Sequence, residues 1–146
     1  MTAAEKFRRL LQKDTRYHPE AYNFVYEALD HTLKHIVQTQ ERSHHVSGGQ
    51  LLEGIRQLSI EQFGCLARPI LECWGIRSTE DVGRIVFNLV EHDLMGKQES
   101  DSLEDFRGVY EFDEVFDLAP LFHYSGEDGD WKATYVTRSQ LSRMRS

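Results

Sequence analysis

Long apolar runs are absent from this chain: no stretch of eighteen apolar residues occurs, which excludes an ordinary transmembrane helix. Cysteine is also scarce, and the two cysteines, Cys65 and Cys73, are expected on one helix. That spacing would separate their Cα atoms by roughly 12 Å, beyond the roughly 7 Å limit for a disulfide. We therefore expect free, buried thiols. Because the amino-terminal segment also lacks the pattern of a signal peptide, the sequence predicts a cytoplasmic protein that does not bind membranes.

Basic residues are nearly absent from residues 99–130, where Arg107 stands among eleven acids. The next segment, 131–146, reverses this bias with four basic residues and no acid, and the net charge of the whole chain is −7. An acidic surface repels phosphate, so nucleic-acid binding over the whole protein is disfavoured. A local contact between the basic tail and an anion is still possible.

Apolar residues recur at helical spacing through residues 1–96, and the chain of 146 residues has the length of a single domain. Ser47 followed by Gln50 is the spacing of a capping box, and Ser59 with Gln62 repeats it. Gly75 and Gly96 are placed to end helices, and Pro69 should kink or split the helix that contains it. Helices are predicted over residues 1–13, 19–40, 48–58, 59–74 and 79–93.

Residues 97–130 form an acidic, mixed region, and residues 131–146 form a strand with a basic tail. We predict a short strand at 109–112, a helical turn stopped by Pro120, a loop at 125–130 and a strand at 131–137. The fold class is therefore mostly α (α+β), a helical bundle with a small mixed carboxy-terminal region. Three helices followed by strands also resemble a winged-helix layout, with the helix at 79–93 in the recognition position.

Four of the seven histidines lie within residues 31–45, and three of them are candidate metal ligands. His31 and His35 share one helical face, and His45 is a third candidate from the adjoining loop. A zinc site usually needs three or four ligands, and no cysteine is near this group. Partly buried helical histidines beside a loop are therefore the favoured interpretation, and a metal site is the alternative.

Large aromatic residues are interspersed with acids between residues 99 and 122. They are either a recognition surface or a lid over the helical core, and the lid is favoured because aromatic residues so often belong to cores. No arrangement of nucleophile and base, no phosphate-binding loop and no cofactor motif is present in the chain, so the sequence does not favour an enzyme.

Five segments carry a resemblance to a known family: "RYHPEAYNFVYEAL", "HVSGGQLLEGIRQ", "QFG…WGI", "DVGRIVFNLVEHDLM" and "DSLEDFRGVYEFDEVF". In this order they cover residues 14–117 and resemble a small bacterial protein family described mainly from planctomycetes and verrucomicrobia. Gly49 and "QLLEG" depart slightly from the family pattern, and His44 is not part of it. The family has no assigned activity, so the resemblance implies no catalytic or binding residues.

The best prediction from the sequence is a non-enzymatic interaction or regulatory module without a cofactor. Its partner would be another protein or a second copy, bound through the helix at 79–93 and the acidic, aromatic region. The alternative is a winged-helix-like nucleic-acid binder, and the metalloprotein is a third hypothesis. The basic residues that would contact phosphate in the nucleic-acid binder are Arg77, Arg84, Lys132, Arg138, Arg143 and Arg145.

Overall fold

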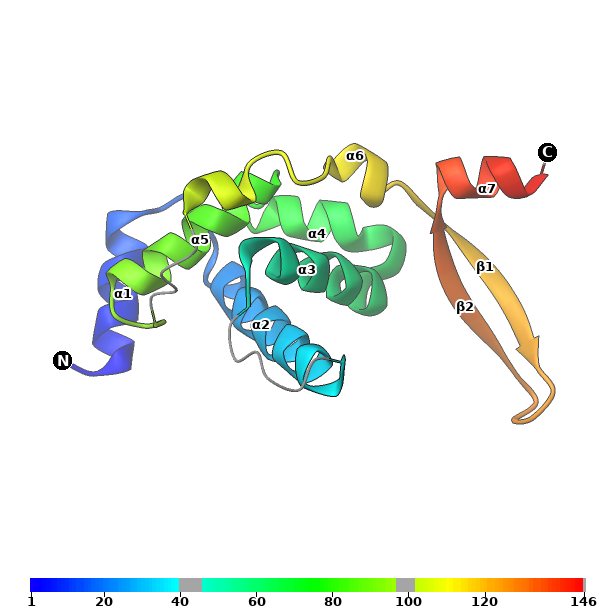
Figure 1. Ribbon diagram of the computed structural model, residues 1–146, viewed down its shortest axis with the longest axis horizontal. Helices are drawn as coiled ribbons and strands as arrows, with labels where there is room; N and C mark the ends of the chain where they lie inside the picture. The colour runs from blue at the N-terminus through cyan, green and yellow to red at the C-terminus, as the bar shows by residue number, and fades with distance from the viewer. Residues whose placement is uncertain (40–45, 97–101, 146) are drawn as a thin grey trace.

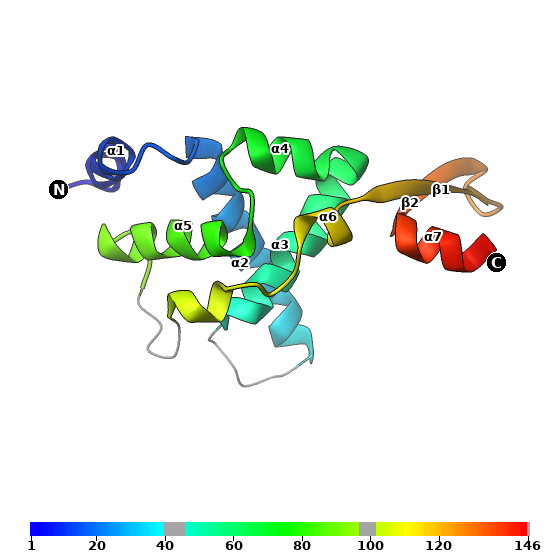
Figure 2. The ribbon, with the colours of Figure 1, turned by 90° about the horizontal axis from the view of Figure 1, so that it is seen from above.

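The computed structural model describes residues 1–39, 46–96 and 102–145, and its described part is mostly helical with one two-stranded antiparallel sheet (Figures 1 and 2). This confirms the predicted fold class. None of the described helices combines the length and the apolar character needed to cross a membrane. The elements are α1 (Ala3–Lys13), α2 (Pro19–Thr39), α3 (Gly48–Phe63), the 3-10 helix η1 (Gly64–Leu66), α4 (Ala67–Cys73), α5 (Thr79–Glu91), the 3-10 helix η2 (Leu103–Phe106), α6 (Phe112–Val115), β1 (Leu118–Ser125), β2 (Asp130–Thr137) and α7 (Arg138–Arg145).

The start of α3 and the end of α4 follow their local sequence signals. Ser47 accepts a hydrogen bond from the Gln50 amide (3.2 Å), and the Gln50 side chain accepts one from the Ser47 amide (2.9 Å), which completes the predicted capping box. At the end of α4, Gly75 has φ +93°, and the Ile76 amide donates to the Leu71 carbonyl (2.9 Å). This is a Schellman ending, and the two apolar side chains that accompany it, Leu71 and Ile76, are fully buried.

Three predicted helix boundaries are wrong. Ser59 does not begin a helix but lies inside α3, where it is fully buried, because the apolar face of α3 continues past it. The chain breaks at Gly64 (φ +53°) rather than at Pro69, which sits in the first turn of α4, where a proline is tolerated. Gly96 does not end α5: the helix stops at Glu91, and Asp93 takes the left-handed conformation (φ 58°).

The carboxy-terminal predictions are correct only in part. Residues 109–112 form no strand, and Pro120 does not stop a helix but lies within β1, paired with Tyr135. A two-stranded hairpin leaves the outer edge of each strand unpaired, which is where a proline is accepted. The loop before β2 and the strand at 131–137 are confirmed, and the basic tail forms α7.

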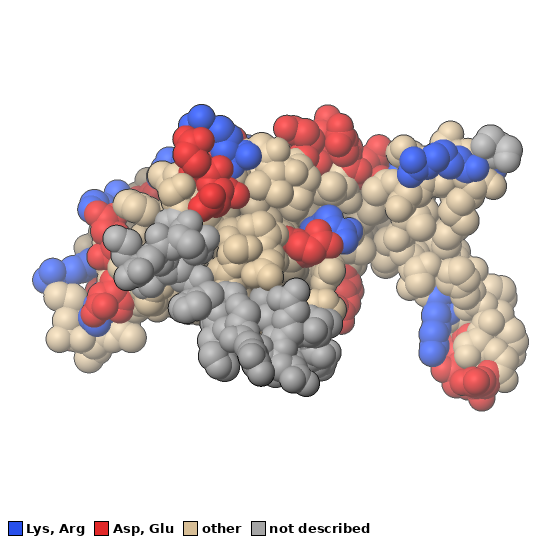
Figure 3. Space-filling view, in the orientation of Figure 1, with Lys and Arg blue, Asp and Glu red and all other residues tan. Residues whose placement is uncertain are grey.

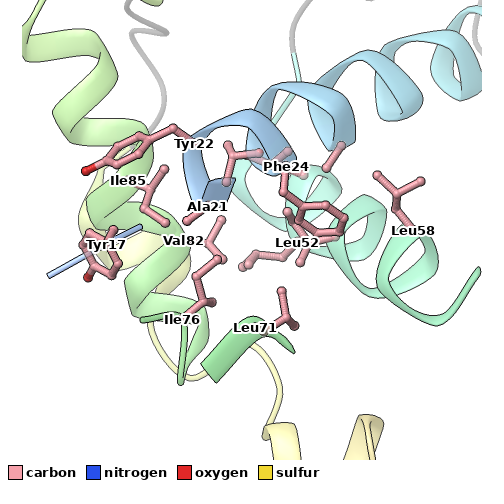
Figure 4. Packing of buried hydrophobic residues seen from close by; sticks show 14 of the residues in the cluster. Tyr17, Ala21, Tyr22, Phe24, Leu52, Leu58, Leu71, Ile76, Val82 and Ile85 are labelled. Carbon is pink, nitrogen blue, oxygen red and sulfur yellow. The ribbon is translucent and has the colours of Figure 1, made fainter. Parts of the chain in front are cut away.

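The core lies where α2, α3, α4 and α5 converge (Figure 4). Tyr22 and Phe24 of α2, Leu52 of α3, Leu71 of α4 and Ile85 of α5 are all at most 2% exposed. Three aromatic side chains from the acidic region complete this core, which confirms the lid interpretation: Phe106, Phe112 and Phe116.

The β1–β2 hairpin together with α7, which we call the arm, projects from one end of the helical body (Figures 1 and 2). Its root packs on η1, where the Tyr135 ring covers Gly64, and the Cys65 thiol lies 3.5 Å from the Leu118 carbonyl. An ion pair between Arg138 and Asp117 (2.9 Å) adds a contact at the same joint. The arm therefore lies at the opposite end of the body from α5, not beside it as a wing would lie.

Candidate functional site

An apolar groove of about 700 Å³ lies between α2, α3, α5 and η2, and we call it the α5 groove. Val86 and Val90 of α5 line one wall, Leu29 of α2 and Leu51 of α3 line another, and Leu103 of η2 closes a third. Its volume falls in the range of about 300–1,000 Å³ typical of ligand pockets. Among the described residues that line it, Glu104 alone is charged.

The floor of the α5 groove depends on two glycines that hold one aromatic ring between them. A Cβ on Gly83 of α5 would lie 2.7 Å from Cγ of Phe106, and a Cβ on Gly48 of α3 would lie 3.2 Å from the same ring. Real Cβ contacts are not as close as 2.7 Å, so Gly83 admits a side chain only if η2 moves, whereas the tighter-than-usual 3.2 Å contact at Gly48 would need a smaller shift of the Phe106 ring or of Asp105. The close approach to α5 at Gly83 is thus made by the Phe106 ring.

Hydrogen bonds from the start of α5 hold η2 in place. The Thr79 hydroxyl, which is buried, donates to the Phe106 carbonyl (2.6 Å), and the Gly108 amide donates to the Glu80 carboxylate (2.9 Å). The Gly108 amide is also the main cause of a lowered pKa at Glu80. The wall formed by η2 is therefore anchored by backbone groups and not only by the Phe106 ring.

Two of the apolar side chains that line this groove are largely exposed. Phe87 of α5 is 54% exposed and Leu103 is 48% exposed. Glu104 forms an ion pair with Arg107 (3.2 Å), but both side chains are about 70% exposed, so this pair contributes little stability. The Glu104 carboxylate is consequently able to leave Arg107 and form an ion pair with a basic group of a bound molecule instead.

Of the three candidate histidine ligands, the structure describes two, His31 and His35. His31 is half-buried on α2, with Nε2 3.5 Å from the Gln57 side-chain oxygen, and His35 is exposed one turn further along. His45, the third candidate ligand, lies outside the described residues. No cluster of three or more His, Cys, Asp or Glu side chains suited to a metal ion occurs within residues 1–39, 46–96 and 102–145.

The predicted phosphate-binding residues are divided between two places. Arg84 lies on α5, where it pairs with Asp81 (3.0 Å), and Arg77 is exposed just before that helix. The remaining four belong to the arm at the other end of the molecule (Figure 1): Lys132, Arg138, Arg143 and Arg145. The structure therefore does not bring these six residues together into one surface.

The two cysteines are free, as expected, but both are exposed, so the prediction of buried thiols is wrong. The reason is the break after α3: Cys65 falls in η1 and Cys73 at the end of α4, on the outer side of the turn that the chain makes there.

A polar network supports α5 on the side of the α1–α2 connection. Asn88 is buried, and its amide donates to Asp14 (2.9 Å) and to the Tyr22 hydroxyl (3.1 Å). Asp14 in turn receives two bonds from the Arg16 guanidinium, which is the largest cause of a lowered Asp14 pKa. These contacts fix the orientation of α5, and hence the wall that it gives to the groove.

Sequence reasoning missed this groove. One signal for it was present, because Val86, Phe87 and Val90 widen the apolar face of α5 beyond the buried residues Val82, Ile85 and Leu89. Such a wide face predicts contacts on two sides of a helix. The position of η2, which completes the groove, carries no comparable signal.

Comparisons of the sequence with protein-family models and with curated proteins, and of the structure with solved structures, found no significant match. Functional inference for this chain therefore depends on the geometry of the groove and of the arm.

Proposed function

We propose that this protein is a non-enzymatic interaction module and that the α5 groove binds an amphipathic helical segment of another protein. The carrying observation is the apolar groove of about 700 Å³ whose lining includes the exposed side chains of Phe87 and Leu103. Apolar surface of this kind on a folded chain marks interaction sites more often than not. The helix at 79–93, which the sequence analysis assigned to binding, thus keeps that role, whereas the buried aromatic residues of the acidic region do not.

The apolar lining, the helical walls and the single charge of the groove favour a helix as its occupant. An amphipathic helix presents apolar side chains at positions i, i+3, i+4 and i+7, and such a stripe fits an apolar groove walled by helices. A basic residue beside that apolar stripe would meet Glu104, the one charged side chain among the described lining residues. The expected partner is therefore an apolar helical stripe flanked by lysine or arginine.

The proposal is tested with helical peptides selected from a random library against the full chain. We expect the selected peptides to share an apolar i, i+3, i+4, i+7 pattern with a basic flank, and their affinity to fall at least about tenfold for Phe87→Asp, since a charge is placed in the contact. Leu66→Asp is the matched control because Leu66 is an equally exposed apolar residue on η1, outside the groove.

Two results would reject this proposal. The first is a set of peptides whose binding is unchanged by Phe87→Asp. The second is a groove that takes up the neutral apolar dye Nile red in a Phe87-dependent way while no selected peptide binds there, which would indicate a small-molecule site instead.

The nucleic-acid alternative has less support, because Arg77 and Arg84 lie apart from the basic residues of the arm and Arg84 is paired with Asp81. An electrophoretic shift with random-sequence DNA at low salt tests it. Salt-sensitive binding that is lost on removal of residues 132–146 would favour nucleic acid as the partner, and absence of binding at micromolar protein would eliminate it.

A further inference from the structure

The two faces of the β1–β2 hairpin differ in charge. Directly paired residues point to the same side of a sheet, so the register assigns one face without a single charged residue, which we call the uncharged face. The opposite face carries His123, Lys132 and Asp130. The uncharged face consists of Leu118, Pro120, Phe122 and Tyr124 from β1, and Trp131, Ala133, Tyr135 and Thr137 from β2.

The uncharged face is covered at its root and bare towards its tip. At the root, Leu118 is 6% exposed and the Tyr135 ring packs on Gly64, so close that a Cβ there would lie 2.5 Å from Tyr135 Cζ. Further along the same face, Phe122 is 68% exposed, Trp131 64% and Tyr124 60%. The body covers only the first part of a continuous apolar surface.

This exposure is costly for an isolated hairpin. A two-stranded hairpin is marginally stable in water, and its cross-strand pair Tyr124–Trp131, with ring centroids 5.4 Å apart, faces solvent. Large aromatic side chains gathered on one projecting face are typical of the buried centre of a protein interface. A further surface is therefore needed to cover Phe122, Tyr124 and Trp131.

We infer that the distal part of the uncharged face binds the same face of a second copy of this chain. A face without charge meets itself with no like-charge repulsion, which is the condition for a two-fold contact in which the same patch serves both partners. The uncharged face is one continuous surface. Its root is covered by η1 of the same chain, and a second copy would cover the remaining, exposed part.

The charges next to the arm favour the same occupant. Acidic side chains gather over α6 and basic ones over α7, on neighbouring parts of one side of the molecule (Figure 3). Within residues 102–117 six acids accompany one base, whereas residues 131–146 contain four bases and no acid. A second copy carries both an acidic and a basic surface, so it is able to place its basic surface against the acidic one and its acidic surface against the basic one. A partner with charge of a single sign would be repelled by one of these two surfaces.

Sedimentation equilibrium of the full chain, from roughly 1 to 200 µM, tests the inference because a dimer equilibrium depends on concentration. We expect a dimer, and we expect Phe122→Ser/Trp131→Ser to weaken it at least about tenfold. The matched control is His123→Ser/Thr134→Ser, which changes the same two strands on the opposite face and should leave the dimer unchanged. Phe87→Asp, in the α5 groove, should also leave it unchanged.

A second variant guards against a misfolded arm. Tyr124→Lys places one positive charge on each copy at the contact, so the dimer should weaken at low salt and recover in high salt, which screens like charges. A wild-type chain that stays monomeric at the highest concentration would overturn the inference and assign the face to a different protein. A dimer that persists at low salt in both Phe122→Ser/Trp131→Ser and Tyr124→Lys would overturn the inference as well.

Discussion

The Phe106 ring lies directly over Gly83, where a Cβ would approach Cγ of the ring to 2.7 Å and Cβ of the same residue to 2.8 Å. Because the close atoms include Phe106 Cβ, rotation of the ring cannot relieve the contact, and η2 itself must move. This one contact fixes η2 against α5 and so forms the floor of the α5 groove.

Gly83→Ala should therefore destabilise the protein, although alanine is the better helix former by about 1 kcal/mol. Overpacking of this kind costs about 1–3 kcal/mol, so we expect a net loss of about 1 kcal/mol in the free energy of unfolding measured with urea. Gly49→Ala, at the second residue of α3 with nothing within 4 Å of its Cβ, is the control and should be neutral or stabilising. Equal effects of the two substitutions would contradict the packing assigned to Phe106.

Asn88→Ala should cost about 1–3 kcal/mol of unfolding free energy, since it removes a buried amide that bonds both Asp14 and Tyr22 and leaves their oxygens short of a donor. The comparison is Asn23→Ala, at an exposed position on α2 where the amide bonds only Glu20 (3.3 Å). That change should stay within about 0.5 kcal/mol. Thermal and urea unfolding of both variants measure the difference.

Acid should weaken the connection between α1, α2 and α5. Arg16 holds the pKa of Asp14 well below its ordinary value of 3.8, so the folded state favours the ionised form. The resulting stabilisation is fully present above the unfolded pKa and is lost as pH falls below about 3.8 towards the lowered folded pKa. Asp14→Asn should lose about 1 kcal/mol at pH 7 relative to wild type, and this difference should shrink as pH falls below 4.

Asp30→Asn serves as the reference for the acid experiment. Asp30 pairs with Lys34 (2.9 Å) on the exposed side of α2, where both side chains are more than 60% accessible. Such a pair contributes little, so its removal should leave the pH dependence of unfolding close to that of wild type. A difference as large as that of Asp14→Asn would show that general charge, not the Arg16 contact, governs acid stability.

Both cysteines should react with Ellman's reagent in the native state, because both are exposed. We expect two equivalents of thiol per chain without denaturant, and a single equivalent in each of Cys65→Ser and Cys73→Ser. Reactivity that appears only after unfolding would restore the interpretation of buried thiols that the sequence suggested.

Much of the helical body was predictable because its signals are local. The capping box at Ser47, the Schellman ending at Gly75 and the first-turn Pro19 each act within a few residues of the boundary that they set. Ser59 shows the limit of this reasoning: the cap pattern is present, but continuous burial of α3 overrides it. A local signal predicts a boundary only when packing does not require the helix to continue.

The two surfaces proposed for binding were not predictable to the same degree, because each depends on how separate segments pack or pair. The α5 groove exists because Phe106 returns to cover Gly83 and Gly48, and no pattern within residues 102–106 specifies that contact. The uncharged face of the arm depends on the register of β1 on β2, which places Phe122 and Tyr124 on the same side as Trp131. The sequence of each strand predicts which of its residues alternate onto one face, but it does not predict which residue of β1 pairs with which residue of β2.

The division of the chain into body and arm also separates its two indole rings. Trp74 packs between Phe24 and Phe63, with centroids 5.5 and 5.7 Å away, whereas Trp131 stands on the exposed tip of the hairpin. Their fluorescence therefore reports two environments: a more blue-shifted emission from the partly buried Trp74 of the body and a more red-shifted emission from the exposed Trp131 of the arm. One emission spectrum thus contains separate optical signals for the folding of the body and for anything that covers the arm.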